Sequence, residues 1–589
     1  MGLVGAVFAV LLYRDVADVR HNLATARTLL NAAVADPNAL RTDEGRAATG
    51  QKIDQAVGSV AAAKARAGGS APMTVTKWVP GLRGQREGLL QVVDDAAAAT
   101  AAGRGLLIKL DSVTARTQLT DGKVPLEGLR GFQGDLKAAS AEVGRLVRTS
   151  GGLWGPLKDA RREFDTVARD TASRLADGAD ALDVALPFMG ETGDRRYFVA
   201  IQNNAEMRDQ GMVLSFAVVR FENGRLTFER NGSVGDIPLK APAPTEIPPG
   251  TAEVFGSLKP TTLWHSVNAT ADFSWSGGAM QAMYLAATGQ KIDGVIAIDV
   301  VGLQRLIAAV GPVIVAGIAE PVTAENASKI LLHDLYEGLP PSSDQAPRRE
   351  LLSDVTKAVI NRMTTGQRDA VLLGRELGNA AEGGHLRLWS ASAPEEEVFV
   401  RTGLGGGPAS IAADRTIHVA VQNRTATKLD YYVTSSVKTK VTLTKAGDAV
   451  VRTTVTVENR APAGAKPSYQ LGPDQFTSEP GNYTAWVMVW GPAGSRSGAP
   501  VVVESGLPLV QYVVPVAPGQ RQEVTFPDTV IPKAVRDGRL QLRLVPQPRL
   551  EPSDLEVTLE APGWRIGSPR TWRGKWDRVI APSWSVARA

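Results

Sequence analysis

The spacing of apolar residues changes twice along the chain and predicts three kinds of structure. From residue 14 to residue 190, apolar residues, many of them alanine, recur three and four positions apart, which is the period of an amphipathic helix. A clear series is Phe164, Val167, Thr171, Leu175, Ala179, Leu182 and Leu186. Residues 14–190 are therefore predicted to form a helical stalk or bundle, in which Pro80 and Gly81 end one helix.

Between residues 195 and 412, strand-like runs alternate with helical ones. The strand-like runs are "RYFVAIQ", "GMVLSFAVVRFENG" and "GVIAIDVVGL", and Asn223-Gly224 predicts a hairpin turn. Helical spacing appears in "DFSWSGGAMQAMYLAATG", "TAENASKILLHDLYEGL" and "RRELLSDVTKAVINRM". This alternation predicts an α/β domain with helices packed against a sheet. The glycine-rich "GLGGGP" lacks the spacing of a phosphate-binding loop and is interpreted as a linker.

Residues 413–560 consist of short β-rich runs such as "HVAVQN", "VVRTTVTVEN" and "YTAWVMVW", separated by turns rich in Gly, Pro and Asn. That pattern is typical of an all-β sandwich. The predicted fold class is therefore multidomain, α + α/β + all-β: an N-terminal helical stalk, a central α/β domain and a C-terminal β-sandwich.

The first thirteen residues, "MGLVGAVFAVLLY", carry no charge, and Arg14 and Asp15 end the run. A bilayer span needs about 20 apolar residues, and the segment lacks the basic flank and cleavage site of a signal peptide. A buried N-terminal helix is one interpretation. We favour the outer half of a truncated membrane anchor (residues 1–13), which predicts a single-pass protein of the cell membrane with the bulk of the chain extracytoplasmic.

The amino-acid composition excludes disulfide bonds and argues against a metal site. The 589 residues include no cysteine, which excludes disulfides and thiolate metal sites. Only five histidines occur, and no two have a spacing that suits a metal ion, so no metal site is expected.

The net charge of +4 is concentrated in residues 561–589, where six Lys and Arg against one Asp give +5 and leave about −1 for the rest of the chain. The positive charge is therefore confined to this basic, Trp-rich tail, and it does not indicate that the protein as a whole binds nucleic acid. Its candidate surface-binding residues are Trp572, Arg573, Lys575, Trp576 and Arg578. Such a tail can bind sugars or an anionic membrane surface, or it can supply closing strands of the sandwich. We favour binding slightly over closing strands, and predict that truncation before Gly567 leaves the thermal midpoint within a few degrees while it abolishes retention on anionic glycopolymer or liposomes.

A run of polar residues, "QNNAEMRDQ", directly follows the first central strand. Arg208 is suited to an anion, because a guanidinium forks onto two phosphate oxygens, although an ion pair with a nearby carboxylate is an equal alternative. Asn203 and Asn204 suit sugar hydroxyls or, more often, cap the next turn. Asp299 ends the strand "GVIAI", where α/β sheets place ligands. The candidate ligand-binding residues are Asn203, Asn204, Glu206, Arg208, Asp209, Asp236 and Asp299.

Three segments of the central region, "RRYFVAIQNNAEMRDQG", "IDGVIAIDVVGLQRLIAAVGPV" and "VTAENASKILLHDLY", resemble in order and spacing the bacterial domain-of-unknown-function family 4012 (DUF4012). The flanks "KWVPGLRGQREGLLQVVDDA" and "KLDYYVTSSVKTKVTLT" also look like this family, which extends the resemblance over nearly the whole chain. The resemblance implies a single-pass, outward-facing membrane protein linked to polysaccharide export and glycosyltransferase functions. Where the family usually has a small turn and two glycines after its Arg, this chain has "DQGM".

The central layout is more weakly similar to the LytR-CpsA-Psr phosphotransferases, which transfer glycopolymers from a polyprenyl pyrophosphate carrier and hold magnesium with carboxylates. Arg208 would match the Arg of their Arg-x-Asp-Thr motif, but their Asp falls on Gln210. The stretch "GSVGDIPL" keeps Ser233 and Asp236 and has Gly235 in place of Pro-Arg. This resemblance implies the fold more than the chemistry.

These observations predict a membrane-anchored, extracytoplasmic envelope protein that binds or positions a cell-surface glycopolymer and needs no cofactor. Its expected partners are the membrane and a cell-wall or capsular glycopolymer or a polyprenyl-linked glycan, with no nucleic acid. The alternative is a metal-dependent phosphotransferase or hydrolase acting on a polyprenyl pyrophosphate-linked glycan. It would need Mg²⁺ held near Arg208 by oxygens from Glu206, Asp209, Asp236 or Asp299.

Overall fold

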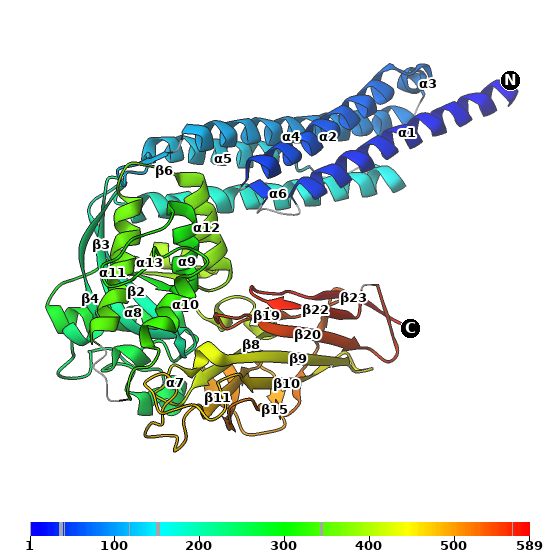
Figure 1. Cartoon of the computed structure of the whole chain (residues 1–589). Coiled ribbons are helices and arrows are strands. Elements are labelled where there is room, and N and C mark those ends of the chain that lie inside the picture. Colours follow the sequence, from blue (N-terminus) through cyan, green and yellow to red (C-terminus); the bar gives the residue numbers. More distant parts are fainter. Residues whose placement is uncertain are drawn as a thin grey trace. The chain divides into compact units, whose positions relative to one another are not determined.

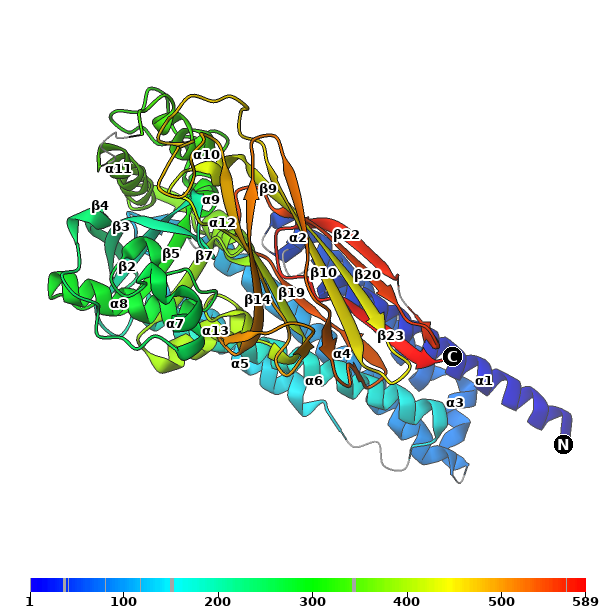
Figure 2. The same cartoon turned by 90° about the horizontal axis from the view of Figure 1, so that it is seen from below.

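The computed structural model, shown in Figures 1 and 2, describes residues 2–34, 39–40, 42–79, 81–116, 118–148, 153–341, 346–567 and 569–589. It contains an N-terminal helical region, a central α/β region and a C-terminal strand-rich region, as the apolar spacing predicted. The chain divides into two compact units. The first comprises Met1–Leu119, Val124–Pro187 and Asp369–Leu372, and the second comprises Thr120–Lys123, Phe188–Arg368 and Leu373–Ala589.

The first unit is built from long helices that run alongside one another (Figure 1). They are α1 (Gly2–Val34), α2 (Asp43–Gly69), α3 (Ala71–Val75), α4 (Leu82–Arg116), α5 (Leu126–Arg145) and α6 (Gly155–Phe188). The alanine-rich faces form much of its interior, and one cluster contains Val19, Ala26, Ala56, Val60, Ala63, Ala67 and Val93. Small side chains let the helices approach closely but bury little area for each residue.

Charged groups are also buried between these helices. The guanidinium of Arg161 donates hydrogen bonds to Asp95 and to Asp165, each at 2.5 Å, and all three side chains are almost fully buried. Burial opposes the charged form of Arg161, but the hydrogen bonds from Arg161 to the two carboxylates raise its pKa. An alanine-rich bundle therefore holds a buried ionic cluster, in which loss of Arg161 would leave buried carboxylate charge uncompensated.

Residues 2–13, predicted as the outer half of a membrane anchor, form the beginning of α1. Among the helices that the structure describes, none is long enough and apolar enough to cross a bilayer.

The central region is organised around a mixed five-stranded sheet with the order β4-β3-β2-β5-β7. Its strands are β2 (Arg195–Met207), β3 (Gly211–Glu222), β4 (Arg225–Ser233), β5 (Gly294–Asp299) and β7 (Leu386–Ser390). β2 and β5 are parallel, and the other pairs are antiparallel. The predicted hairpin turn is confirmed, because Asn223 and Gly224 join β3 to β4 with φ of 46° and 77°, the left-handed conformation that such a turn requires.

The helices of this region are α7 (Pro249–Phe255), α8 (Phe273–Thr288), α9 (Val300–Val310), α10 (Ala327–Leu332), α11 (Ala346–Met363), α12 (Ala370–Glu382) and α13 (Ala393–Thr402). Aromatic side chains fill the core between α8 and the sheet. Phe198 of β2 stacks on Phe216 of β3 at 5.6 Å and on Trp264 at 5.2 Å between ring centroids. These stacked rings belong to the hydrophobic core that covers one face of the central strand β2.

The strand-rich region contains three sheets, and Figure 2 shows several of their long strands side by side. A seven-stranded sheet has the order β12-β16-β10-β9-β20-β22 with β15 also on β10, a five-stranded sheet the order β13-β14-β11-β8-β19, and a four-stranded sheet the order β17-β18-β23-β21. The longer strands are β8 (Thr416–Asn423), β9 (Val433–Leu443), β10 (Ala449–Asn459), β11 (Tyr483–Trp490), β14 (Leu507–Val516) and β20 (Ser553–Glu560). The shorter ones are β12 (Arg496–Ser497), β13 (Val502–Glu504), β15 (Arg521–Thr525), β16 (Thr529–Ile531), β17 (Val535–Arg536), β18 (Arg539–Gln541) and β19 (Arg543–Val545). Two of the pairs, β8 with β19 and β9 with β20, are parallel.

Residues 561–589, predicted as a separate basic tail, contribute three strands to these sheets. They are β21 (Trp564–Ile566), β22 (Thr571–Trp576) and β23 (Ser583–Arg588). β22 pairs with β20, and β23 pairs with both β18 and β21. Trp576 and Trp584, only 2% and 3% exposed, belong to the core shared by the sheets. Residues 561–589 therefore supply closing strands of the strand-rich region, which was one of the two interpretations of the sequence.

Candidate functional site

Most of the polar run after the first central strand, from Gln202 to Met207, is part of that strand. β2 continues to Met207, and every residue from Gln202 to Gln210 is buried. The β2–β3 ladder has irregularities after Ile201 and after Asn203. Gly211 permits the close return of the chain, since a Cβ there would lie 2.6 Å from the carbonyl carbon of Asn203. The polar side chains therefore lie inside the second unit.

The two asparagines bind local backbone and a neighbouring carboxylate. Asn203 Oδ1 accepts a hydrogen bond from Ala205 N at 2.9 Å, and its buried Nδ2 has no partner among the described residues. Asn204 Oδ1 accepts from Val300 N at 3.1 Å, while its Nδ2 donates to Asp299 Oδ2 at 2.8 Å. Asn203 thus binds the backbone two residues on, as a turn-capping side chain does, whereas Asn204 links β2 to the end of β5 and the start of α9.

Asp299 ends β5 and caps α9. Its Oδ1 accepts from Gly302 N at 2.8 Å, and its Oδ2 lies 2.6 Å from His385 Nδ1. With Asn204 also donating to Oδ2, both carboxylate oxygens are engaged in a site that is almost fully buried.

Arg208 is buried, and the described residues give it no carboxylate partner within ion-pair distance. Its Nη1 donates to the carbonyl oxygen of Asn423 at 2.7 Å, and its Nε is buried without a partner. Burial lowers the pKa of Arg208 to about 10, although the negative charges of Glu206 and Asp430 oppose the shift. The ion pair that was the alternative to anion binding is therefore not formed.

Glu206 instead pairs with Lys428 of the strand-rich region. Lys428 is 1% exposed, and its ammonium lies 4.2 Å from the ring centroid of Tyr336 and 5.6 Å from that of Tyr469. Burial opposes the ammonium form, but the negative charge of Glu206 and the two tyrosines raise the pKa of Lys428. The ammonium of Lys428 is therefore stabilised by the carboxylate of Glu206 and by the rings of Tyr336 and Tyr469.

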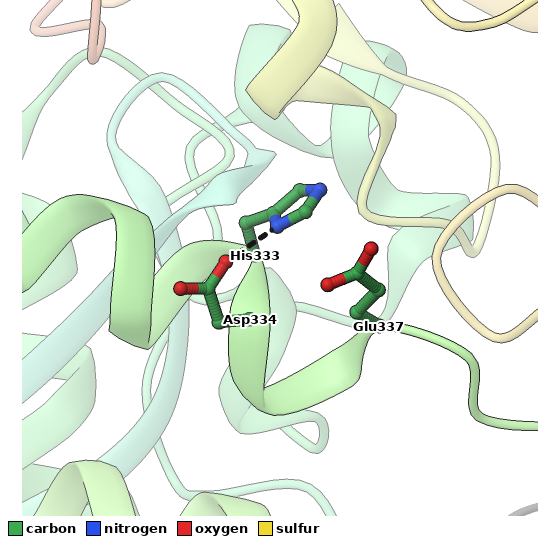
Figure 3. Close-up of side chains that lie close together, drawn as sticks. All are labelled: His333, Asp334 and Glu337. Carbon is green, nitrogen blue, oxygen red and sulfur yellow. Dashed lines mark hydrogen bonds and ion pairs between the residues drawn. The ribbon is translucent and has the colours of Figure 1, made fainter. Parts of the chain in front are cut away.

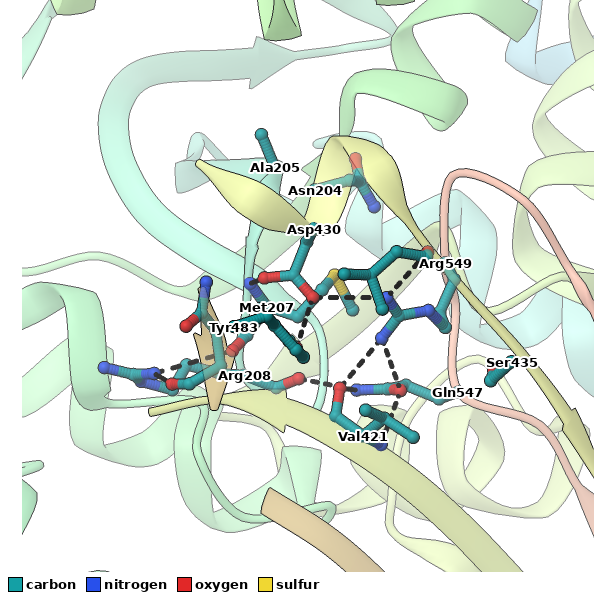
Figure 4. A network of polar contacts seen from close by, with 12 residues as sticks. Asn204, Ala205, Met207, Arg208, Val421, Asp430, Ser435, Tyr483, Gln547 and Arg549 are labelled. Atoms are coloured by element: carbon teal, nitrogen blue, oxygen red, sulfur yellow. Dashed lines mark hydrogen bonds and ion pairs between the residues drawn. The ribbon is translucent and has the colours of Figure 1, made fainter. Parts of the chain in front are cut away.

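Asp430 connects the end of β2 to the strand-rich region in the network of Figure 4. It accepts hydrogen bonds from Met207 N at 3.0 Å, from the hydroxyl of Tyr483 at 2.9 Å and from Arg549 Nη2 at 3.1 Å. Gln547 adds a further link, because its Nε2 donates to the carbonyl oxygen of Arg208 at 2.7 Å. Burial raises the pKa of Asp430, and the charge of Arg549 opposes that shift. The network joins the two regions of one compact unit through buried polar groups, although Nε of Arg549 has no partner among the described residues.

The two remaining predicted carboxylates are engaged separately. Asp209 Oδ1 lies 2.7 Å from Nε2 of the buried His418, whose Nδ1 faces the carbonyl oxygen of Val545 at 3.0 Å. Asp236 accepts from Ser233 N at 2.9 Å and completes the cap of a short helical turn. The candidates from Asn203 to Asp209 and Asp299 thus gather at one end of β2 and β5. Asp236 makes no hydrogen bond or ion pair with them in the described part of the chain.

Within the described residues, one group of side chains has the spacing for a metal ion, and it lies outside the predicted set. The ligand atoms of His333, Asp334 and Glu337 lie within 4.8 Å of one another (Figure 3). His333 already contacts Asp334 Oδ1 through Nδ1 and the Tyr432 hydroxyl through Nε2, each at 2.8 Å, and Lys329 pairs with the other oxygen of Asp334. His333 and Asp334 are therefore engaged by groups of the protein, and Glu337 is exposed.

Two basic residues of 561–589, Arg573 and Lys575, lie exposed on β22 of the seven-stranded sheet. Arg573 pairs with Glu556 at 2.7 Å and Lys575 with Asp554 at 2.8 Å, both across the β20–β22 ladder. Arg578 contacts Asp577 at 3.1 Å and Glu382 at 3.8 Å. Trp572 packs against the core from the inner face, and Trp576 lies within it. Neighbouring carboxylates thus balance much of the positive charge.

The candidate residues that lie at the ends of β2 and β5 are called the strand-end cluster below. The sequence analysis did not predict the side chains that bind them. They are His385, His418, Lys428, Asp430, Gln547 and Arg549. Most lie more than 200 positions after the residues that they contact, in segments without a local motif. Only His385 and His418, two of the five histidines in the chain, offered a compositional signal.

Comparison with known proteins adds a family. Residues 192–336 match the family model described as "Protein of unknown function (DUF4012)". The match covers β2 to the start of the His333 cluster, which is a shorter stretch than the resemblance over nearly the whole chain that the flanking motifs implied. No curated protein and no solved structure matches the chain. The family indicated by the sequence motifs is confirmed for residues 192–336, which are similar to DUF4012.

Proposed function

We propose that this protein is a membrane-anchored, extracytoplasmic envelope protein that binds or positions a cell-surface glycopolymer without catalysing its transfer. The choice between binding and transfer rests on one observation: the carboxylates that a metal-dependent transfer would use are already engaged. Glu206 is bound by Lys428, Asp209 by His418, Asp299 by His385 and Asn204, and Asp236 by Ser233 N. A hard cation needs several free oxygen ligands at one point, and these groups do not offer them. The glycopolymer itself is proposed from the sequence resemblance alone.

Exposed aromatic residues support the membrane part of the proposal. Tyr13, Trp78 and Trp154 are 77%, 84% and 58% exposed. Asp15 of α1 pairs with Arg66, close to the end of α2, at 2.9 Å, so that Tyr13 lies near the end of the first unit. Trp and Tyr are enriched where a protein enters the headgroup layer of a bilayer.

The other two aromatics belong to the same end of the first unit. Trp78 follows α3, and a Cβ at Gly81 would lie 3.6 Å from the ring of Trp154. The backbone N–H of Trp154 also donates to Gln85 in the first turn of α4. The beginning of α1 and all three aromatics therefore lie at one end of the unit, where we place the membrane surface.

We also propose finer assignments for the two regions of the second unit. The seven-stranded and five-stranded sheets contribute to one buried core, which includes Val437, Val455 and Val487, as the two layers of a β-sandwich do. For the central sheet we propose a layout like that of the LytR-CpsA-Psr proteins, on the strength of the order of its strands and hairpin in the sequence.

Membrane association is tested with the full tagged chain in two steps. Cell fractionation should recover it with membranes, and recovery in the soluble cytoplasm would contradict the proposal. With purified protein, Trp78→Ala combined with Trp154→Ala should weaken flotation with lipid vesicles. Phe476→Ala, which removes a 57%-exposed aromatic of the second unit, is the matched control and should have no effect.

Binding and transfer are separated with a polyprenyl pyrophosphate-linked glycan. We expect the wild-type protein to be retained on immobilised envelope glycopolymer and to release no carrier when Mg²⁺ is added. Magnesium-dependent release of the carrier that is lost in Glu206→Gln would favour the phosphotransferase alternative instead.

A further inference from the structure

A cavity of about 60 Å³ lies between the central sheet and the strand-rich region of the second unit. Its wall includes Arg387 of the edge strand β7, Arg543 of β19 and the glycine-rich segment 403–407 that follows α13. The exposed residues Glu382 and Val579 also line it, so that it opens at the surface. The cavity is distinct from the strand-end cluster around Arg208.

Its two arginines have no counter-ion among the described residues. The partly buried guanidinium of Arg387 makes no hydrogen bond and no ion pair there. Arg543 Nη1 reaches only neutral oxygens, the carbonyl of Pro408 at 3.2 Å and the hydroxyl of Thr416 at 3.5 Å. Burial lowers the pKa of Arg387, and burial together with the charge of Arg387 lowers the pKa of Arg543. Two like charges thus face one low-dielectric space, where their repulsion is strong.

Two carboxylates, Asp209 and Asp272, act on Arg387 through their negative charge, which opposes the lowering of the Arg387 pKa. Asp209 is shared with His418, whose other ring nitrogen faces a carbonyl oxygen. Asp209 is therefore already engaged by a neighbouring imidazole. Asp272 caps α8 by accepting from Trp275 N at 3.4 Å, and burial raises the pKa of Asp272. Neither group forms a direct ion pair with Arg387.

The glycine-rich segment brings the chain close enough to form a wall. A Cβ on Gly405 would lie 2.8 Å from the carbonyl oxygen of Leu388 and 3.2 Å from Cβ of Phe399. A Cβ on Gly407 would lie 3.0 Å from Cα of Asp272. Any larger residue would push the segment away from β7. "GLGGGP", interpreted from the sequence as a linker, is thus packed against the strand that carries Arg387.

We propose that this cavity binds one phosphate group, presented as a phosphomonoester or phosphodiester of the ligand. Two guanidinium groups match the geometry of phosphate oxygens and supply charge-assisted hydrogen bonds. A water needs roughly 10–15 Å³ of such volume, so about 60 Å³ accommodates one phosphate. The phosphate site stands on this geometry, whereas its assignment to a phosphate-bearing glycopolymer rests on the proposed function.

The probe is inorganic phosphate, added to the full chain at constant ionic strength with chloride as the balancing anion. We expect phosphate to raise the thermal midpoint of the wild-type protein and to give a saturable calorimetric signal. Arg387→Gln and Arg543→Gln should each weaken binding about 10- to 100-fold, the loss of one or two charge-assisted hydrogen bonds. Arg539→Gln removes the same charge from an exposed position on β18 and should bind phosphate as the wild type does.

A structural role for Arg387 predicts a different result. If Arg387 stabilises the fold, Arg387→Gln should lower the midpoint even without phosphate. If it is an unpaired cation awaiting an anion, Arg387→Gln should leave the midpoint unchanged or raise it, because the repulsion with Arg543 is removed. Equal stabilisation of wild type and both variants by phosphate, or no stabilisation of the wild type beyond that of chloride, overturns the site.

Retention on immobilised phosphate-bearing and neutral glycans separates this site from the proposed function. Retention on the phosphate-bearing glycan that is lost in Arg387→Gln supports both. If Arg387→Gln and Arg543→Gln are retained to the same extent as the wild type, the phosphate site is refuted and glycopolymer binding is supported. If free phosphate binds through both arginines but neither glycan is retained, the site stands and the proposed function falls.

Discussion

Removal of residues 567–589 tests how the basic C-terminal strands contribute to the protein. As a free tail, this segment could be deleted without loss of stability. In the structure, the deletion removes β22 and β23, and with them two tryptophans that are no more than 3% exposed. We therefore expect the opposite of the result that follows from a surface-binding tail: the strand-rich region should lose its cooperative unfolding transition.

The magnitude follows from the buried tryptophans. A Trp side chain buries roughly 150–250 Å², which at about 25 cal/mol for each Å² corresponds to about 4–6 kcal/mol. Measured Trp→Ala substitutions in protein cores cost about 3–5 kcal/mol. Loss of both Trp576 and Trp584 is therefore comparable to the roughly 5–15 kcal/mol by which a whole domain is stable.

Two single substitutions on adjacent residues of β22 give a sharper version of the test. Trp576→Ala should lower the free energy of unfolding by about 3–5 kcal/mol, measured by urea denaturation with far-ultraviolet circular dichroism. Lys575→Ala removes an exposed partner of Asp554 and should stay within about 0.5 kcal/mol of the wild type. A loss below about 1 kcal/mol for Trp576→Ala, or equal losses for the two variants, would show that β22 is not held as described.

Three further predictions concern buried charge. Lys428→Met should cost about 3–5 kcal/mol because it leaves Glu206 buried without its cation; urea denaturation should show much of this recovered when Glu206→Gln is added, and equal loss in both would contradict the pairing. Arg161→Met should destabilise the helical unit by a similar amount of about 3–5 kcal/mol, seen as an earlier loss of helical circular dichroism on heating, whereas an unchanged melt would mean that the cluster is hydrated. For Glu396, burial raises the pKa above its usual 4.5 although two hydrogen bonds oppose the shift. Its contribution to stability is therefore full below pH 4.5 and is lost as the pH rises through the raised value. Glu396→Gln should remove this loss, so parallel stability–pH curves for variant and wild type would refute the shift.

The parts of the fold that could be predicted are those specified by local periodicity. The three- and four-residue spacing before residue 190 predicted the long helices, and Asn223-Gly224 predicted the hairpin because few residues tolerate positive φ at both positions. The closing strand β22 also carried a local signal. Trp572, Gly574 and Trp576 alternate with Arg573 and Lys575, which is the period of a strand with one buried face.

The environment of the polar run could not be predicted, because its partners are distant in sequence. Glu206 pairs with Lys428, 222 positions later, and Met207 N with Asp430, 223 positions later. A polar strand end is equally compatible with a solvated ligand site and with a buried junction until the chain that covers it is known. Six of the seven predicted residues are close together or on adjacent strands, since parallel strands bring their carboxyl ends to one edge. Their partners, however, come from the strand-rich region and from the end of the central one.

The contrast among buried arginines indicates where an anion would bind. Arg161 and Arg549 contact carboxylates, whereas Arg208 donates to a backbone carbonyl oxygen and is only 8% exposed. An unpaired buried cation is costly unless solvent or a bound anion compensates it. Arg387 and Arg543 have neither a carboxylate partner nor full exposure, and they share a cavity that opens at the surface. The ligand chemistry first assigned to Arg208 is therefore better placed at Arg387, where an entering phosphate would neutralise charge that the chain itself leaves unpaired.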